Sequence, residues 1–183
     1  MRVALGLGVA EDVTRATAGG ELIEAILRDR QTKAIERLFR LLGLAHPGED
    51  WKRMYLGLES KDPGARASSR ELLEHILEEP LRGAVLALVD DIPDADRFSS
   101  AEPLHRLDPL PYESLLGGLL DSGGETLQCL AAYHVGELGL ERLRPQLEHL
   151  LPDASEFMVS VVKRAIELLD DPDREVMHSV RVL

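Results

Sequence analysis

The sequence predicts an all-α protein whose helices pair into hairpins and repeat along the chain as an α-α superhelix, or solenoid. Leu, Ala, Glu and Arg dominate the composition, aromatic residues make up only 4%, and β-branched runs are scarce, a balance that favours helix. Apolar residues recur at i, i+3 and i+4 in successive segments. Shifting the chain by 31 residues places Leu127 on Met158 and Val135 on Ile166, and such a fixed period is typical of repeat proteins.

The overall composition excludes several classes of protein. The chain has 183 residues, of which 44% are hydrophobic and 30% charged, and its net charge is −12. Such a charge repels a phosphate backbone, and Arg and Lys are interleaved with Glu and Asp, so we expect no nucleic-acid partner. No apolar run approaches the roughly 18 residues of a membrane span, so this chain does not insert into a membrane. The single cysteine, Cys129, fits a reducing compartment, which favours a cytoplasmic protein.

Three regions follow from the distribution of apolar and polar residues. Residues 1–20 are an N-terminal leader or linker: the apolar start is short and interrupted by glycines, unlike a signal peptide, and Ala18-Gly19-Gly20 reads as a linker or cap. Residues 21–170 are the predicted solenoid, with an irregular repeat at 90–111 where prolines and aspartates break the period. Residues 171–183 are a C-terminal tail.

Apolar spacing and capping residues predict the helices of the first half. A long helix covers 21–42, with a wholly polar middle that we expect to lie in solvent, and Gly43 ends it at the C′ position. A short helix over 49–60 carries Trp51, Met54, Tyr55 and Leu58 on one face. The next helix starts at Asp62-Pro63, with Asp as N-cap and Pro at the first position, and runs to Leu77. The apolar segment 81–89 is a buried helix.

The second half contains an irregular segment and then two regular copies. A degenerate helix over 95–107, interrupted near Pro103, leads into the first copy, which pairs a helix over 112–121 with one over 127–138. The second copy pairs 140–151, which Pro145 should bend, with 158–169.

The string 127–139 carries a family resemblance. Ala131-Ala132, Val135-Gly136 and Leu138-Gly139 follow one another in the order of small and aliphatic residues found in the second helix of a HEAT repeat, an armadillo-like hairpin. His134 stands where that family usually has a small apolar residue. The small residues have a physical role, because paired helices approach closely only where side chains are short. The resemblance covers roughly 35–170 and implies a HEAT-like α-solenoid.

A second, looser resemblance concerns 35–77. The strings Glu36-Arg37-Leu38-Phe39-Arg40 and Glu71-Leu72-Leu73 are similar to a HEAT-like bacterial region that follows membrane domains related to nucleotide translocases. This resemblance implies that the chain is the cytoplasmic part of a larger membrane-associated protein. No transport or nucleotide function carries over, because neither neighbouring domain is present in the sequence.

His134 and Glu137 are the strongest candidates for chemistry, because they lie one turn apart on one predicted helix. HEAT-like proteins similar to deoxyhypusine hydroxylase bind two irons through adjacent His-Glu pairs at equivalent sites of several repeats. Here the two residues are not adjacent, and Glu74-His75 and Glu148-His149 are reversed and out of register. We therefore expect no metal site and interpret the histidines as packing or surface residues.

No other pattern indicates catalysis or cofactor binding. Cys129 is interpreted as a buried apolar residue, and the serines lack a His/Asp constellation. Gly117-Gly118 lacks the preceding strand and following Lys of a phosphate loop, and the acidic segment 90–96 lacks the Gly and bidentate Glu of a calcium loop. We therefore predict no catalytic residue and no cofactor.

The sequence thus favours a non-catalytic protein-interaction or scaffold module that binds a protein or peptide. Second helices usually line the concave face of a solenoid, where a partner would lie. Their exposed polar positions are the candidate partner-binding residues: Arg66, Arg70, Gln128, Tyr133, Lys163 and Arg164. The alternative is an enzyme or lyase on the same repeats, with a groove site near His134 and Glu137.

Overall fold

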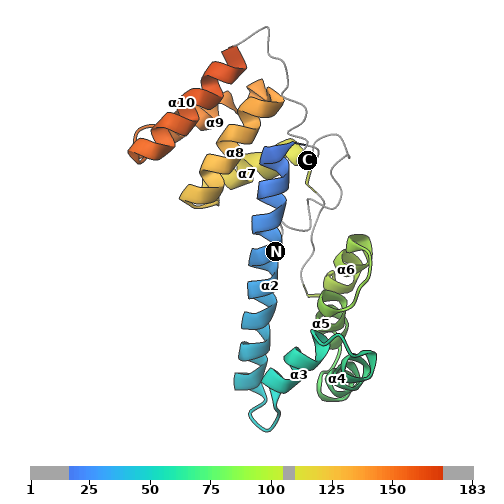
Figure 1. The fold of residues 1–183 in the computed structure, drawn as a ribbon. Helices are drawn as coiled ribbons and strands as arrows, with labels where there is room; N and C mark the ends of the chain where they lie inside the picture. The colour runs from blue at the N-terminus through green and yellow to red at the C-terminus, as the bar shows by residue number, and fades with distance from the viewer. Residues whose placement is uncertain (1–16, 105–109, 171–183) are drawn as a thin grey trace. The chain divides into compact units, whose positions relative to one another are not determined.

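The computed structural model describes residues 17–104 and 110–170, which form helices, turns and loops without a strand. The all-α class is therefore confirmed for this part of the chain (Figure 1). The described residues divide into two compact units, one made of 29–104 and the other of 17–28 with 110–170. None of the described helices is both long and apolar enough to cross a membrane. The predicted leader up to residue 16 and the tail at 171–183 lie outside the described residues.

Helix α2 (Ala18–Ala45) contributes residues to both units. It begins three residues earlier than predicted, so Ala18-Gly19-Gly20, interpreted from the sequence as a linker or cap, forms its first turn. Thr17 explains the early start, because its Oγ1 accepts a hydrogen bond from the backbone N–H of Gly20 at 3.2 Å, as an N-cap residue does. The polar middle of the helix is mostly exposed, as predicted.

The end of α2 also differs from the prediction, because the helix passes through Gly43 and ends at Ala45. The indole N–H of Trp51 donates to the carbonyl of His46 at 3.1 Å, and the backbone N–H of His46 donates to the carbonyl of Leu42. These bonds satisfy the end of the helix without a glycine in the C′ position. The glycine instead lies against the Trp51 side chain, where an added Cβ would be in ordinary contact at 3.5 Å.

The first unit contains the second part of α2 and four further helices: α3 (Trp51–Leu58), α4 (Pro63–Ile76), α5 (Leu81–Val89) and α6 (Asp94–Ala101). Helix α3 packs on α4, α4 on α5, and α5 on α6. Asp62 caps α4 by accepting from the N–H groups of Gly64 and Ala65, which confirms the predicted start. The degenerate helix predicted for 95–107 is present as α6, which ends at Ala101 before Pro103, and residues 105–107 of the prediction lie outside the described residues.

The core of this unit gathers around Phe39 and Trp51, whose rings meet edge to face with centroids 6.2 Å apart. Both side chains are buried, as are the other core residues Leu42, Met54, Leu73, Leu77 and Val85. The predicted helical stripe of the second helix is confirmed in part, because Trp51 and Met54 are buried while Tyr55 is half-buried. Segment 81–89 is a helix as predicted, with Ala84, Val85 and Ala87 buried.

The second unit contains the first part of α2 and two helical hairpins. Its helices are α7 (Tyr112–Ser122), α8 (Glu125–Leu138), a 3-10 turn η2 (Glu141–Leu143), α9 (Arg144–Leu150) and α10 (Glu156–Asp170). Helix α7 packs on α8, α9 packs on α10 and on α7, and α10 runs along α8.

The sequence predicts that Pro145 bends the first helix of the second hairpin. In the structure this helix is instead divided into two pieces. The 3-10 turn ends at Leu143 and a new helix begins at Arg144. Pro145 therefore lies in the first turn of α9, where its missing N–H has no helical acceptor to lose. Dividing the helix avoids the clash that a proline causes in a helix interior.

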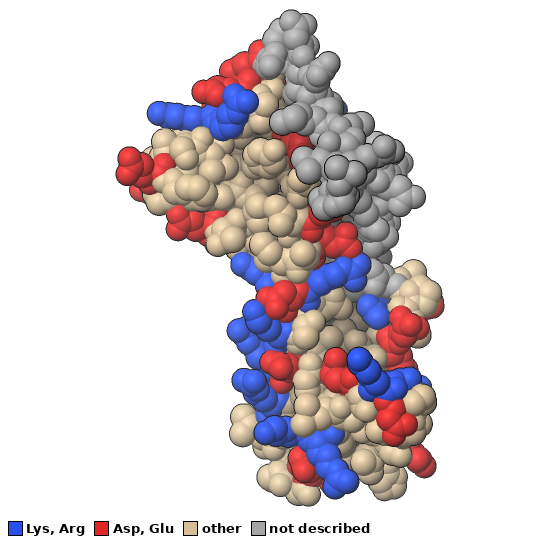
Figure 2. Space-filling view, in the orientation of Figure 1, with Lys and Arg blue, Asp and Glu red and all other residues tan. Residues whose placement is uncertain are grey.

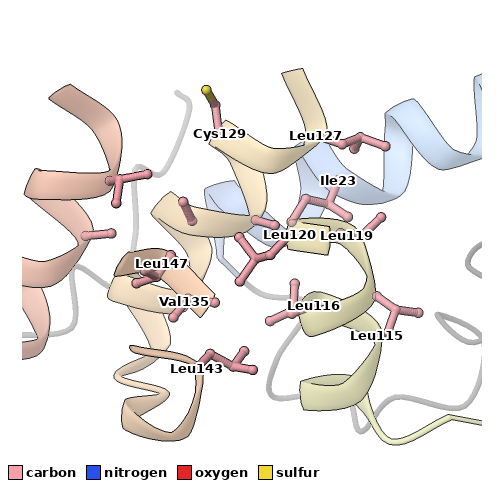
Figure 3. Packing of buried hydrophobic residues seen from close by; sticks show 14 of the residues in the cluster. Ile23, Leu115, Leu116, Leu119, Leu120, Leu127, Cys129, Val135, Leu143 and Leu147 are labelled. Atoms are coloured by element: carbon pink, nitrogen blue, oxygen red, sulfur yellow. The ribbon is translucent and has the colours of Figure 1, made fainter. Parts of the chain in front are cut away.

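The core of the second unit lies between its hairpins and the start of α2 (Figure 3). Ile23 and Leu27 of α2 join buried residues of α7, α8, α9 and α10 in one cluster. Helices α8 and α10 approach closely at Gly136, where an added Cβ would lie 2.8 Å from the Cα of Ala165. The predicted role of the small residues, close helix contact, is therefore confirmed at this position.

Candidate functional site

His134 is the one histidine that the structure buries completely among the described residues, with an exposed fraction of 0%. It lies on α8 in the core of the second unit. A buried imidazole needs hydrogen-bond partners for both ring nitrogens, because burial of an unpaired polar group is costly. The partners of this ring therefore define the candidate site.

Three side chains surround the ring. Its Nε2 lies 2.7 Å from the hydroxyl of Tyr112, and its Nδ1 lies 2.8 Å from Oε2 of Glu137 and 3.2 Å from Oγ1 of Thr17. A carboxylate only accepts hydrogen bonds, so Nδ1 carries the proton and donates to Glu137. Nε2 is then the acceptor for the hydroxyl of Tyr112. The contacts assign one tautomer to the ring.

Each partner comes from a different part of the unit. Thr17 precedes α2, Tyr112 is the first residue of α7, and Glu137 follows His134 by nearly one turn of α8. The hairpin brings Tyr112 to the ring, because the first turn of α7 lies beside the last turns of the antiparallel α8. Gly19 allows α2 to approach, since an added Cβ would lie 2.7 Å from the Glu137 carboxylate and 2.9 Å from Nδ1.

Burial determines the electrostatics of the site. It lowers the pKa of His134 below the usual value, while the hydrogen bond and charge of Glu137 act in the opposite direction. The imidazole is therefore neutral at neutral pH. Both ring nitrogens are hydrogen-bonded and the ring has no exposed surface, so a substrate cannot reach an atom of the ring that could transfer a proton. The arrangement ties the starts of α2 and α7 to α8.

The sequence predicted one half of this site. The nearness of His134 and Glu137 on one helix is confirmed, and both lie in the interior, with 11% of the Glu137 side chain exposed. Tyr112 and Thr17 were missed. The hairpin prediction itself contained a signal for Tyr112, because a residue that begins the first helix lies opposite the end of the second. No local pattern indicated Thr17. Among the described residues, no three His, Cys, Asp or Glu side chains are placed to hold a metal ion.

A second candidate site is a groove of about 600 Å³ in the first unit, between α2 and α3. Phe39 and Gly43 of α2 and Trp51, Tyr55 and Leu56 of α3 form its apolar surface. The ring centroids of Phe39 and Tyr55 are 5.2 Å apart, and Leu56 is 58% exposed. Charged residues complete the lining: Glu36, Arg40, Glu49, Asp50 and Lys52. The groove has an aromatic floor, an exposed leucine and a charged rim.

Two of the predicted partner-binding residues, Arg66 and Arg70, are exposed on α4. A guanidinium N–H of Arg66 donates to the carbonyl of Ser60 at 2.7 Å. Arg70 forms ion pairs with Glu74 and, at 3.2 Å, with Asp90. Both arginines therefore already bind neighbours within the first unit.

The other four predicted residues lie in the second unit. Gln128 is half-buried, not exposed, and its amide donates to the carbonyl of Leu120 at 2.8 Å, which ties α8 to α7. Tyr133 is 40% exposed, and Lys163 and Arg164 are exposed on α10. Arg164 pairs with Glu167 at 3.0 Å. The six predicted residues are therefore divided between the two units.

Cys129 is buried as predicted, with 7% of its surface exposed. Burial, with the nearby charge of Glu125 as the smaller cause, raises the pKa of its thiol. A thiol with a raised pKa is not a nucleophile at neutral pH.

Comparisons with protein-family models, with curated proteins and with solved structures gave no match for this chain.

Proposed function

We propose that this protein is a non-catalytic interaction or scaffold module built from HEAT-like helical hairpins. The observation that carries the proposal is the groove between α2 and α3, which presents aromatic and aliphatic side chains in a concave surface. Aromatic residues and arginine dominate the binding energy of protein interfaces. The same role suits the cytoplasmic part of a larger membrane-associated protein, as the looser resemblance implies.

The repeat interpretation is supported by the second unit. Two of the residue pairs that the 31-residue shift equates have similar environments, since Leu127 and Met158 are both buried and Leu130 and Val161 are both half-buried, whereas Val135 is buried and Ile166 is half-buried. Helices α8 and α10, which carry these pairs, lie against each other. Repeat proteins place equivalent residues in equivalent environments because each hairpin packs on the next.

An amphipathic helix of a partner protein is the occupant that we propose for the groove. The walls of the groove are themselves helices, and a third helix can pack into the space between two helices with its apolar residues on Tyr55 and Leu56. Phe39 and Trp51 beneath them are buried and packed on each other. A rigid floor favours binding because its side chains lose little conformational entropy when the partner docks.

The enzymatic alternative, a site near His134 and Glu137, has less support. The chain of hydrogen bonds from Glu137 through His134 to the hydroxyl of Tyr112 has the order of a catalytic relay. However, the imidazole is fully buried, and relay residues act only where a substrate reaches the activated hydroxyl. The network is better explained as a buried structural one.

A peptide-display experiment tests the proposed function. Helical peptides selected on the immobilised protein are titrated against the parent chain, Leu56→Glu and the control Leu22→Glu, whose leucine has a similar exposure, 53% against 58%, in the other unit. We expect Leu56→Glu to weaken binding by about tenfold or more, with the control unchanged. Failure to select any peptide, or equal binding by both variants, would contradict the groove as the partner site.

A further inference from the structure

The second part of α2 has an exposed face that carries both cationic and large apolar side chains. Five residues form it, and we call them the outer stripe: Arg30, Lys33, Arg37, Leu41 and Leu44. The two leucines are 62% and 80% exposed. The opposite face of the same helix buries Phe39 and Leu42 in the core of the first unit. The helix therefore presents two apolar surfaces, and only one of them is covered by described residues.

The outer stripe is basic in an acidic protein. Residues 30–45 contain four cationic side chains and one carboxylate, although the net charge of the whole chain is −12. Figure 2 shows Lys and Arg side chains gathered along α2. Along the sequence these cations are interleaved with Glu and Asp, and they gather on one face only because the segment is helical.

The cationic side chains of this region are exposed. Lys33 pairs with Asp29 at 2.6 Å and Arg40 pairs with Glu36 at 3.6 Å, but both pairs lie on the surface, with 59% and 76% of the cationic side chains exposed. Exposed pairs of this kind are weak and exchange readily. Arg37 is exposed and makes no ion pair with any residue that the structure describes.

The spacing of the stripe matches a helical partner. Its members follow one another at intervals of three and four residues, the spacing of a seam along which two helices pack. From Arg30 to Leu44 the stripe is about 21 Å long at 1.5 Å per residue. The cations lie toward one end of the stripe and the leucines at the other. A partner helix therefore needs acidic residues toward one end and apolar residues toward the other.

We propose that an acidic amphipathic helix of a partner protein packs along the outer stripe of α2. Its carboxylates face Arg30, Lys33 and Arg37, and its apolar side chains cover Leu41 and Leu44. Charge complementarity of this kind speeds encounter and fixes register, while the apolar contact supplies affinity.

The other anionic partners fit less well. A nucleic acid gains nothing from two exposed leucines, and the stripe has no aromatic side chain on which a base could stack. A membrane-surface helix immerses its large apolar face, but that face of α2 is occupied by the core of its own unit. The charge of −12 repels both kinds of extended polyanion more than it repels a short helix with a few carboxylates.

This surface is distinct from the groove of the proposed function. The outer stripe and the groove lining share no residue, because the groove uses Glu36, Phe39, Arg40 and Gly43 of α2. A failure at one surface leaves the other unaffected, and the variants Leu56→Glu and Leu44→Ser separate them.

The test uses a fluorescent helical peptide of about five turns with Glu and Leu placed to complement the stripe. It is titrated against the parent chain, Arg37→Glu, Leu44→Ser and a control, Arg142→Glu, whose guanidinium is 88% exposed in the second unit. We expect Arg37→Glu and Leu44→Ser each to weaken binding by about tenfold or more at low salt, and Arg142→Glu to change it little. A peptide with Lys in place of Glu should bind weakly to the parent chain and better to Arg37→Glu.

Several outcomes would overturn the proposal. The acidic peptide fails to bind, or it binds Arg37→Glu and Arg142→Glu equally. If duplex DNA, or vesicles of phosphatidylserine and phosphatidylcholine, bind the parent chain more tightly than the peptide does and bind Arg37→Glu weakly, the stripe is a phosphate-binding surface. If sedimentation shows that the parent chain is a dimer and that Leu44→Ser is a monomer, the stripe binds a second copy of this chain. Circular dichroism of each variant confirms that the fold is retained.

Discussion

Gly136 of α8 faces Ala165 of α10 so closely that an added Cβ would lie 2.8 Å from the Cα and 3.0 Å from the carbonyl oxygen of Ala165. This contact joins the two hairpins of the second unit, and it requires a residue without a side chain on one helix and a small one on the other. The Cα and the carbonyl oxygen of Ala165 cannot rotate away from an added methyl group, because both are backbone atoms.

Gly136→Ala should therefore destabilise the protein by about 1–3 kcal/mol, because α8 and α10 must separate to accept the methyl group. The matched control is Gly118→Ala on α7, an exposed position with nothing within 4 Å of the added Cβ. This control should be neutral or stabilise by up to about 1 kcal/mol, since alanine favours helix over glycine. Chemical denaturation of both variants measures the difference, and equal stabilities would contradict the close contact.

Tyr112→Phe removes the hydroxyl that donates to Nε2 of His134 at 2.7 Å. The buried nitrogen then has no donor, and we expect a loss of about 1–3 kcal/mol in the free energy of unfolding. Tyr133→Phe is the control, because its ring is 40% exposed and water can bind its hydroxyl. A loss below about 0.5 kcal/mol in Tyr112→Phe would show that the hydrogen bond contributes little.

The burial of His134 makes stability depend on pH. Its pKa is lowered in the folded state, whereas the unfolded chain has the ordinary value of about 6.5. Above that pH the imidazole is neutral in both the folded and the unfolded state, and its contribution to the free energy of unfolding is fully present. As the pH falls from about 6.5 toward the folded pKa, the unfolded state takes up a proton first, so the free energy of unfolding decreases.

The variant His134→Gln tests this dependence. It should be less stable than the parent at neutral pH, and the difference between the two should narrow as the pH falls below about 6.5. His75→Gln and His149→Gln, at exposed positions, are the controls for replacing a histidine outside the core. A parallel pH profile for the parent and His134→Gln would contradict the lowered pKa.

Ala131→Asp places a carboxylate at a position with an exposed fraction of 0%. The unpaired charge should cost at least about 4 kcal/mol, enough to unfold the second unit. Thr126→Asp, at an exposed position on the same helix, is the control and should leave the melting temperature nearly unchanged. Retained helicity and melting temperature in Ala131→Asp would show that α8 is placed wrongly.

The misplaced boundaries share a cause. Gly43 and Pro145 are strong local signals for ending or bending a helix, and each was overruled by its surroundings. Trp51 satisfies the end of α2 beyond the glycine, and the turn at Glu141–Leu143 moves the proline into the first turn of a new helix. In both cases residues just outside the signal, and not the glycine or proline alone, set the boundary of the helix.

The sequence by itself determined the helical class, most of the helices and their buried faces, because the 3.6-residue period records which side of each helix avoids water. It also placed His134 and Glu137 on one side of α8. Only the tertiary structure decided that Tyr112 and Thr17 complete the environment of His134, that Gly19 and Gly136 are points of close approach, and that α2 leaves Leu41 and Leu44 uncovered. These features depend on distances between segments far apart in the chain, which no local spacing of residues encodes.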